Sequence, residues 1–188
     1  MENRFANPAP LGLIGFAATT WLLSLVNAGL FPASSMPLVL GMALAFGGGA
    51  QVLAGQLSYI RGNTFATVAF VSYGSFWLSF VAYVHEFGAG APPAFVGWYL
   101  LVWGVFTFYM WIASFRHNTA LQLVFLTLWI TFFILAGGDL FGMAVLHKAG
   151  GYTGLLCAGL AAYLSAAEII NGDFGRTVLP IGATAPAK

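Results

Sequence analysis

Six long apolar runs occupy most of the chain, and short polar or Pro- and Gly-containing segments separate them. The apolar residues are continuous within each run, whereas barrel strands would alternate apolar and polar residues over about ten positions. A bilayer core of roughly 30 Å needs about 20 helical residues. The pattern therefore predicts an all-α bundle of six transmembrane helices, which span residues 11–30, 36–60, 64–84, 94–115, 120–136 and 151–170.

Turn residues predict the ends of these helices, because Pro favours helix starts and Gly favours helix ends. On this basis Gly137-Gly138-Asp139 ends the fifth helix, whereas the start of the sixth at Gly151 follows from its apolar run. The run Gly47-Gly48-Gly49 indicates either close helix packing or a local break in the second helix. We expect one transmembrane domain over residues 1–180 and a flexible tail over residues 181–188, which is rich in Ala, Pro and Thr.

The composition requires lipid as the surrounding solvent. The chain is 60% hydrophobic and 6% charged, whereas roughly a quarter of a soluble domain is charged. Six Lys and Arg plus five Asp and Glu give 11 charged side chains, too few to cover a water-facing surface of this length. The net charge of +1 gives no indication of nucleic-acid binding.

Basic residues predict the orientation, because Lys and Arg accumulate on the cytoplasmic side of a membrane. With six crossings both termini lie on one side, which holds five of the six basic residues, whereas the other side holds Lys148 alone. The five are Arg4, Arg61, Arg116, Arg176 and Lys188. Both termini are therefore expected in the cytoplasm.

The ionisable residues argue against a membrane-embedded enzyme, a metal site or a bound cofactor. The histidines His85, His117 and His147 fall at predicted helix ends, and Cys157 is the single cysteine. An enzyme acting on lipid would need clustered His or acidic residues facing the headgroups, and the sequence has no such cluster. Glu168 is the one acidic residue placed inside a predicted helix, where a carboxylate is a functional candidate. It is also near enough to a helix end to reach the interface or to pair with Arg176.

Uncharged polar residues lie within the predicted helices, among them Thr20, Gln51 and Tyr73. Such side chains either form hydrogen bonds between helices or face a cavity. The opening Asn7-Pro8-Ala9-Pro10 precedes the first helix, and Asn7 is positioned as a helix cap. A helix N-terminus presents free N–H groups that bind a small anion without Lys or Arg, so this segment is either an ordinary cap or an anion site.

The same opening segment carries a resemblance. Asn7-Pro8-Ala9-Pro10-Leu11-Gly12-Leu13 followed by Gly15-Phe16 resembles the signature of the acetate uptake transporter family, which includes succinate–acetate permeases. The similarity continues along the chain in Gly62-Asn63-Thr64-Phe65, Ser72-Tyr73-Gly74-Ser75-Phe76-Trp77, Trp103-Gly104-Val105-Phe106-Thr107 and Phe174-Gly175-Arg176-Thr177-Val178-Leu179-Pro180.

The resemblance implies a six-helix protomer that assembles as a homohexamer in a bacterial-type inner membrane. Each protomer is expected to contain a path that carries acetate, with succinate as a further substrate. By motif position, Phe16, Tyr73 and Leu128 form its hydrophobic constriction. A bulky apolar ring would reject a hydrated inorganic ion through its desolvation cost. A carboxylate with a methyl tail would pass, with the Tyr73 hydroxyl offering a hydrogen bond.

The resemblance also assigns polar positions along the path. Asn7 and Gln51 are expected to bind substrate and Ala161 to influence substrate size. The residues themselves add two further candidates: Thr20, a polar residue inside the first predicted helix, is expected to bind substrate, and Glu168, the carboxylate inside the last one, to take part in coupling. Several relatives carry Glu where this chain has Ser58. That difference leaves open whether the protein is a proton symporter or an anion channel.

Two other hypotheses remain beside acetate uptake. One is a protein of the same family that senses or exports acetate or ammonium, which the direction of flux in vesicles would distinguish. The other is a structural membrane oligomer without transport, against which the polar residues inside the helices argue because packing alone does not need them.

Overall fold

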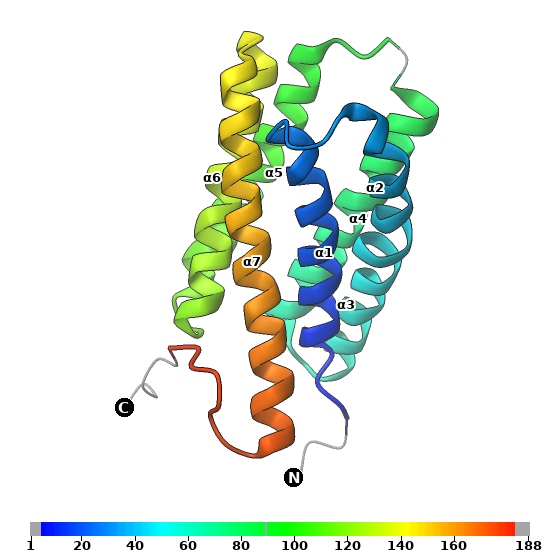
Figure 1. Cartoon of the computed structure of the whole chain (residues 1–188). Coiled ribbons are helices and arrows are strands. Elements are labelled where there is room, and N and C mark those ends of the chain that lie inside the picture. The colour runs from blue at the N-terminus through cyan, green and yellow to red at the C-terminus, as the bar shows by residue number, and fades with distance from the viewer. Residues whose placement is uncertain (1–4, 89, 183–188) are drawn as a thin grey trace.

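The computed structural model describes residues 5–88 and 90–182, and the regular elements in these ranges are helical. Six helical segments in this part of the chain are long and apolar enough to cross a membrane (Figure 1). They are α1 (Ala9–Asn27), the composite segment Ala33–Ile60, the segment Thr64–Phe87, α5 (Pro93–Ser114), α6 (Thr119–Phe141) and α7 (Ala144–Phe174). The prediction of a six-helix all-α membrane protein is confirmed.

The second and third spans change helix type along their length. The second joins the short turn η1 (Ala33–Ser35), α2 (Met36–Met42), the π-helical segment η2 (Ala43–Ala50) and α3 (Gln51–Ile60). The third joins α4 (Thr64–Ala82) to the π-helical turn η3 (Tyr83–Phe87). The triple glycine lies in η2, where a Cβ at Gly47 would lie 2.7 Å from Thr19 Oγ1 and one at Gly48 2.6 Å from Leu78 Cδ2. The glycines therefore allow close packing, and the helix widens there without breaking.

Two predicted helix ends are wrong. The fifth span does not stop at residue 136 but continues to Phe141, and the sixth begins at Ala144 rather than at residue 151. The glycines in these stretches serve packing, since a Cβ at Gly138 would lie 2.9 Å from His147 Cδ2. The chain turns instead at Gly142, whose φ of +64° is a backbone conformation that favours glycine.

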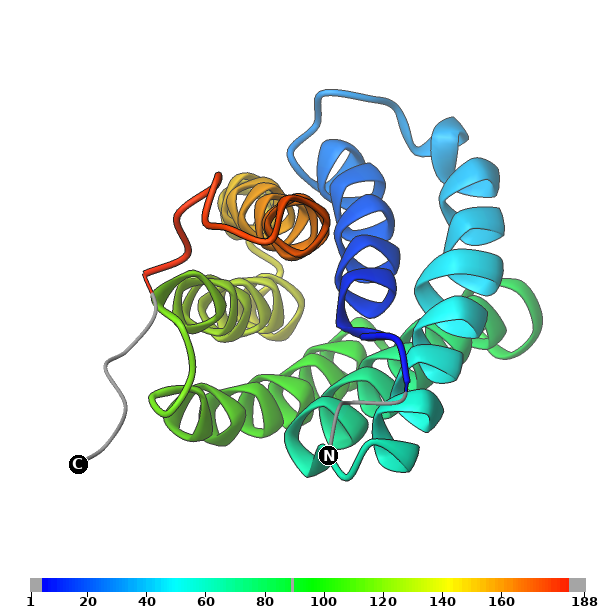
Figure 2. The same cartoon turned by 90° about the horizontal axis from the view of Figure 1, so that it is seen from below.

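The helices form one bundle (Figure 2). In it α1 packs against α7 on one side and against η2 and α3 on the other, while α6 packs between α5 and α7. Buried side chains from α1, α4, α6 and α7 meet in one hydrophobic cluster. Two asparagines start helices at one end of the bundle: Asn63 Oδ1 accepts from Ala66 N at 2.9 Å, and Asn118 Oδ1 accepts from Leu121 N at 2.8 Å.

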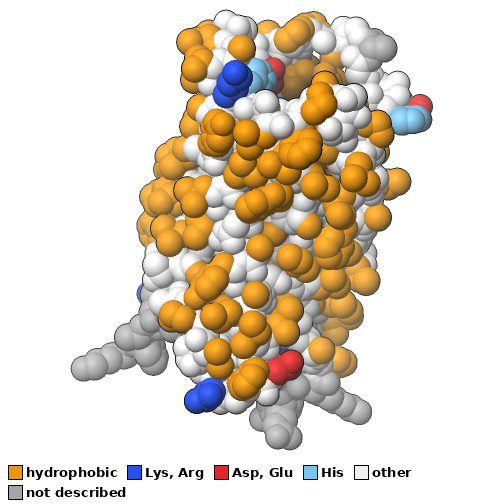
Figure 3. All heavy atoms as spheres, in the orientation of Figure 1, with side chains coloured by type: hydrophobic (Ala, Val, Ile, Leu, Met, Phe, Trp, Pro, Cys, Tyr) orange, Lys and Arg blue, Asp and Glu red, His pale blue; other side chains and the backbone are white. Residues whose placement is uncertain are grey.

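The side of the bundle is apolar. Apolar side chains cover its length in Figure 3, and the charged side chains and histidines in that view gather at the two ends. Large apolar residues are exposed on several helices, such as Trp21 on α1, Val102 on α5 and Leu156 on α7. This distribution is that of a bundle surrounded by lipid.

The segments before α1 and after α7 lie at the same end of the bundle, called here the N-side end (Figure 1). The first two residues of the predicted tail cap α6, because the Ile181 carbonyl accepts from Ala120 N at 3.0 Å and the Gly182 carbonyl accepts from Thr119 N at 2.9 Å. Residues 183–188 of that tail lie outside the described residues.

Candidate functional site

Two cavities enter the bundle from opposite ends. The N-side cavity has a volume of about 120 Å³, and Asn63, His117 and Asn118 line it where α4 and α6 begin. The far-side cavity has a volume of about 260 Å³, and Asp139 and His147 line it where α6 ends and α7 begins. The described Lys and Arg residues line neither cavity.

Phe16, Tyr73 and Leu128 are the described residues that line both cavities. They come from α1, α4 and α6 and are only 6%, 4% and 4% exposed. The ring centroids of Phe16 and Tyr73 are 6.0 Å apart. The cavities therefore approach each other at these three side chains, which are the ones that the family resemblance selects.

The hydroxyl of Tyr73 takes part in a buried chain of hydrogen bonds. It donates to Thr107 Oγ1 at 2.9 Å, and Thr107 Oγ1 donates in turn to the Trp103 carbonyl at 2.7 Å. Both hydroxyl protons are used in these bonds. The Tyr73 oxygen therefore faces its surroundings as a hydrogen-bond acceptor rather than as the donor that a carboxylate would require.

Asn7 and Glu168 form a contact between the two ends of the described chain. Asn7 Nδ2 donates to Glu168 Oε2 at 2.9 Å, and Asn7 Oδ1 accepts from Ala9 N at 3.2 Å. Pairing with Arg176 was one of the two alternatives for Glu168; within the described residues its carboxyl group instead accepts this bond from a neutral amide. Glu168 lines the N-side cavity, whereas Asn7 lines a separate polar cavity of about 230 Å³ beside it, together with Ser58 and Arg61. The N-cap residue of α1 is Pro8, and Asn7, one position earlier, bonds both the first backbone N–H of the helix and the carboxyl group.

Three buried polar groups beside the cavities have no hydrogen-bond partner within the described chain. Gln51 lines the N-side cavity, is 1% exposed and has an unpartnered Oε1. Thr20 Oγ1 and Trp77 Nε1 are likewise unpartnered, and these two residues line the far-side cavity. A buried polar atom without a partner carries a desolvation cost, so these atoms are available to a polar solute.

Ala161 lines neither cavity. It is fully buried in α7 and belongs to the same hydrophobic cluster as Phe16, Tyr73 and Leu128. An effect of this position on substrate size would therefore act through the packing of its neighbours rather than through direct contact with a solute.

The ionisable groups of the two cavities differ. In the N-side cavity, burial lowers the pKa of His117, which favours the neutral imidazole. In the far-side cavity, His147 Nε2 lies 3.0 Å from Asp139 Oδ1. Among the described residues no group of three or more His, Cys, Asp or Glu side chains has an arrangement that could hold a metal ion.

Comparisons with known proteins agree with this architecture. The model of the GPR1/FUN34/yaaH family matches residues 1–181. The chain is 47% identical over 185 residues to the succinate-acetate/proton symporter SatP of Escherichia coli (strain K12), which covers 96% of this chain and 97% of that protein. It is 34% identical to acetate permease A of Emericella nidulans, over 95% of this chain and 66% of that one.

A solved structure gives the same result for the fold. The structure of the bacterial acetate channel SatP matches with a TM-score of 0.92 and 45% sequence identity, and covers 95% of this chain and 100% of the other. The resemblance noted in the sequence motifs is thereby confirmed. The chain belongs to the GPR1/FUN34/yaaH family.

Proposed function

We propose that the protein transports acetate, together with other small carboxylates such as succinate, across a membrane through a path in each protomer. The observation that carries the proposal is the approach of two cavities from opposite ends to the same three side chains, Phe16, Tyr73 and Leu128. Relatives that are named as a succinate-acetate/proton symporter, an acetate permease and an acetate channel support the choice of substrate.

The constriction selects by the cost of losing water. Phe16 and Leu128 offer no polar atom, so a hydrated inorganic ion passing between them would lose its hydration without replacement. Acetate carries a methyl group that can contact an apolar ring without losing hydrogen bonds. Only its carboxyl end loses hydration that polar groups of the path must replace. A dianion such as succinate loses far more hydration than acetate, which makes acetate the favoured substrate.

The hydrogen bonds of Tyr73 favour the protonated acid at the constriction. The Tyr73 oxygen has lone pairs to offer and no free proton, because its own proton is bound by Thr107. Acetic acid donates one O–H to such an oxygen, whereas the acetate carboxylate only accepts. Trp77 Nε1 and Thr20 Oγ1 are unpartnered donors beside the same path and suit the carbonyl oxygen of the acid. This pattern supports proton symport over an anion channel.

The polar residues of the N-side end then receive the substrate. Gln51 offers an unpartnered amide oxygen within the N-side cavity, and Glu168 is the carboxyl group that accepts the proton released there. Asn7 holds Glu168 in position. By the positive-inside rule this end faces the cytoplasm of a bacterial-type inner membrane. We propose a homohexamer, the assembly that the family resemblance implies.

Labelled-acetate uptake into proteoliposomes tests the proposal. We expect uptake above that of protein-free liposomes, an essential control because acetic acid crosses lipid unaided, and an increase when an inward proton gradient is imposed. Phe16→Trp should block the path, whereas Phe95→Trp on the exposed face of α5 should not. No excess uptake by assembled wild-type protein would contradict the proposal, and reversing the acetate or ammonium gradient in the same vesicles tests the export hypothesis.

Replacement of Asn7 tests its role beside Glu168. We expect Asn7→Ala to lower acetate uptake about tenfold, because a hydrogen bond to a charged group contributes about 1.5 kcal/mol or more. Asn7→Ser is the matched variant, since it keeps an oxygen that can cap α1 but lacks the amide that reaches Glu168. If Asn7→Ser transports at the wild-type rate, Asn7 is a helix cap and nothing more.

A further inference from the structure

We propose that Asp139 and His147 form a proton relay at the mouth of the far-side cavity, which passes a proton from the medium to the substrate carboxylate before it reaches the constriction. The inference rests on the proposed acetate transport and adds to it the groups that supply the proton. It concerns the end of the bundle opposite to Glu168.

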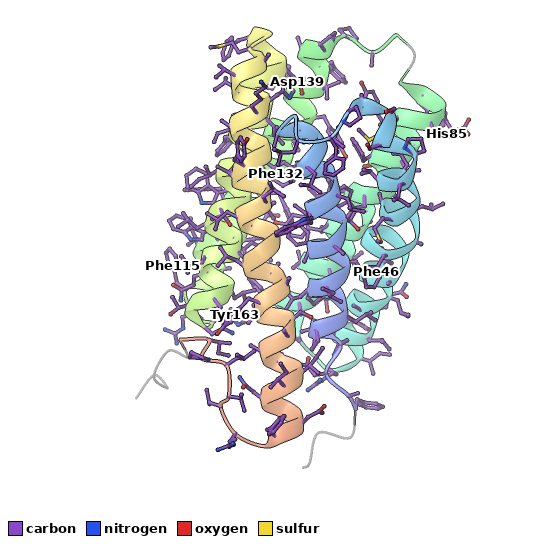
Figure 4. All side chains as sticks on the ribbon, viewed as in Figure 1. Phe46, His85, Phe115, Phe132, Asp139 and Tyr163 are labelled. Atoms are coloured by element: carbon purple, nitrogen blue, oxygen red, sulfur yellow. The ribbon has the colours of Figure 1, made fainter. Side chains whose placement is uncertain are left out.

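The geometry of the pair fits a relay. Asp139 lies in the last turns of α6 and His147 in the first turns of α7, and His147 Nε2 is 3.0 Å from Asp139 Oδ1. Both residues line the far-side cavity. The imidazole is 38% exposed and the carboxyl group 17%, so the histidine is the outer member and the aspartate the inner one. Figure 4 shows Asp139 nearer the end of the bundle than Phe132, a residue that lines the same cavity.

The surrounding backbone makes room for the imidazole. A Cβ at Gly138 would lie 2.9 Å from His147 Cδ2 and 3.1 Å from His147 Nε2, so a side chain there would displace the ring from Asp139. The helix dipoles do not stabilise the charged forms of these two residues. A carboxylate near the C-terminus of α6 and an imidazolium near the N-terminus of α7 each face the unfavourable pole of their own helix. Each charged form is therefore stabilised by the other residue of the pair rather than by its own helix.

The other ionisable groups near this mouth are placed less well than the Asp139–His147 pair to pass protons into the cavity. On α7, Lys148 follows His147, and its Cε approaches the position of Gly29 in the loop after α1 rather than the cavity lining. Tyr99 from α5 and Tyr83 from η3 line the cavity as uncharged phenols. From η3, His85 and Glu86 are exposed and bind each other at 2.9 Å.

The relay has three balanced steps. The medium protonates His147 at Nδ1, and the imidazolium passes the proton on Nε2 to Asp139 Oδ1, which leaves a neutral imidazole with its remaining proton on Nδ1. The Asp139 carboxyl group then gives its proton to a carboxylate oxygen of acetate, so that one O–H bond breaks and another forms. The products are neutral acetic acid, which enters the constriction, and an Asp139 carboxylate. Exchange with water, which takes the proton from Nδ1 of His147 and returns one to Nε2, restores the starting tautomer before the next proton is taken up. No oxidant or reductant is involved.

The pH dependence of transport tests the relay. The probe is equilibrium exchange of labelled acetate in proteoliposomes at equal pH on both sides, with the rate of protein-free liposomes subtracted. With the relay, wild-type exchange should change little between pH 5 and pH 6, because the His147–Asp139 pair supplies the proton and the rate does not follow the concentration of acetic acid in solution. Without it, only acetic acid from solution enters, and its concentration falls about tenfold per pH unit above a carboxyl pKa of about 4–5.

Asp139→Asn and His147→Gln should therefore both show exchange that falls about tenfold per pH unit from pH 5 upward. Lys148→Gln, which removes a charge at the same mouth, should keep the wild-type profile. A wild-type profile in both pair variants would overturn the relay while leaving acetate transport in place. Equal loss at every pH, with a lowered unfolding midpoint, would assign the pair to helix packing and overturn it as well. No exchange by wild-type protein above the liposome control would overturn the proposed function itself.

Discussion

Leu128→Ala is expected to raise lactate uptake about tenfold relative to acetate uptake. Leu128 lines both cavities and is 4% exposed, so its side chain occupies space between them. Lactate is larger than acetate by one carbon and one hydroxyl group, and the shorter alanine side chain leaves room for both. A tenfold change corresponds to about 1.4 kcal/mol in the barrier, a modest demand on one steric contact. Competition between labelled acetate and unlabelled lactate in proteoliposomes measures the change.

Leu123→Ala is the matched control, because Leu123 lies on the same helix but is exposed on its outer face and lines neither cavity. It should leave the ratio of lactate to acetate uptake unchanged. Unchanged selectivity in Leu128→Ala at normal expression would mean that the constriction lies elsewhere along the path. A similar shift in both variants would indicate a general loosening of the bundle instead.

The six spans were predictable because each is a continuous apolar run long enough for a bilayer, and this property belongs to single segments. The ends of the fifth and sixth helices were not. Gly137-Gly138 and Gly150-Gly151 have the appearance of helix ends in a sequence, but in this bundle they lie inside α6 and α7. In membrane helices glycine also permits close approach of neighbours, and its role at a given position depends on the neighbour that the fold supplies.

Identification of the site residues depended on the family resemblance more than prediction of the six spans did. Nothing in the spacing of Phe16, Tyr73 and Leu128 joins three residues from three helices, and only the family motifs selected them. The bonds from Tyr73 to Thr107, from Asn7 to Glu168 and from His147 to Asp139 connect different helices or helix-flanking segments. Sequence patterns report periodicity along one helix, so they identified polar residues inside the membrane without identifying their partners.

The packing of α1 against α7 also has a counterpart in the sequence. Small residues recur along α7 at intervals of three and four: Gly151, Gly154, Ala158, Ala161 and Ser165. They are buried, and a Cβ at Gly154 would contact Ser24 while Ser165 Oγ donates to the Pro10 carbonyl at 2.8 Å. Because α1 carries Phe16, this small-residue face of α7 determines where one side of the constriction lies. The spacing is a general sign of close helix packing in membranes, but it does not identify the partner helix.

Gly151→Val should have the largest effect on stability for this reason. A Cβ at Gly151 would collide with the backbone of Ala28 at the end of α1, and backbone atoms cannot move aside as a flexible side chain can. Overpacking of this kind costs about 1–3 kcal/mol, and the clash with backbone puts this variant at the upper end. For a chain of this size the unfolding midpoint should fall by about 6–12 °C. Thermal unfolding in detergent, monitored as the loss of the folded species, measures this midpoint.

Gly41→Val is the control, because Gly41 lies in α2 with nothing within 4 Å of its Cβ position. It makes the same glycine-to-valine change inside a helix as Gly151→Val, so the difference in helix propensity is the same in both variants. It should unfold near the wild-type midpoint, so the difference between the two variants isolates the α1–α7 contact. If both variants unfold alike, α1 moves away from α7 at little cost. The position of Phe16 would then be held by η2 and α3 on the other side of α1, and substitutions along α7 would leave substrate selectivity unchanged.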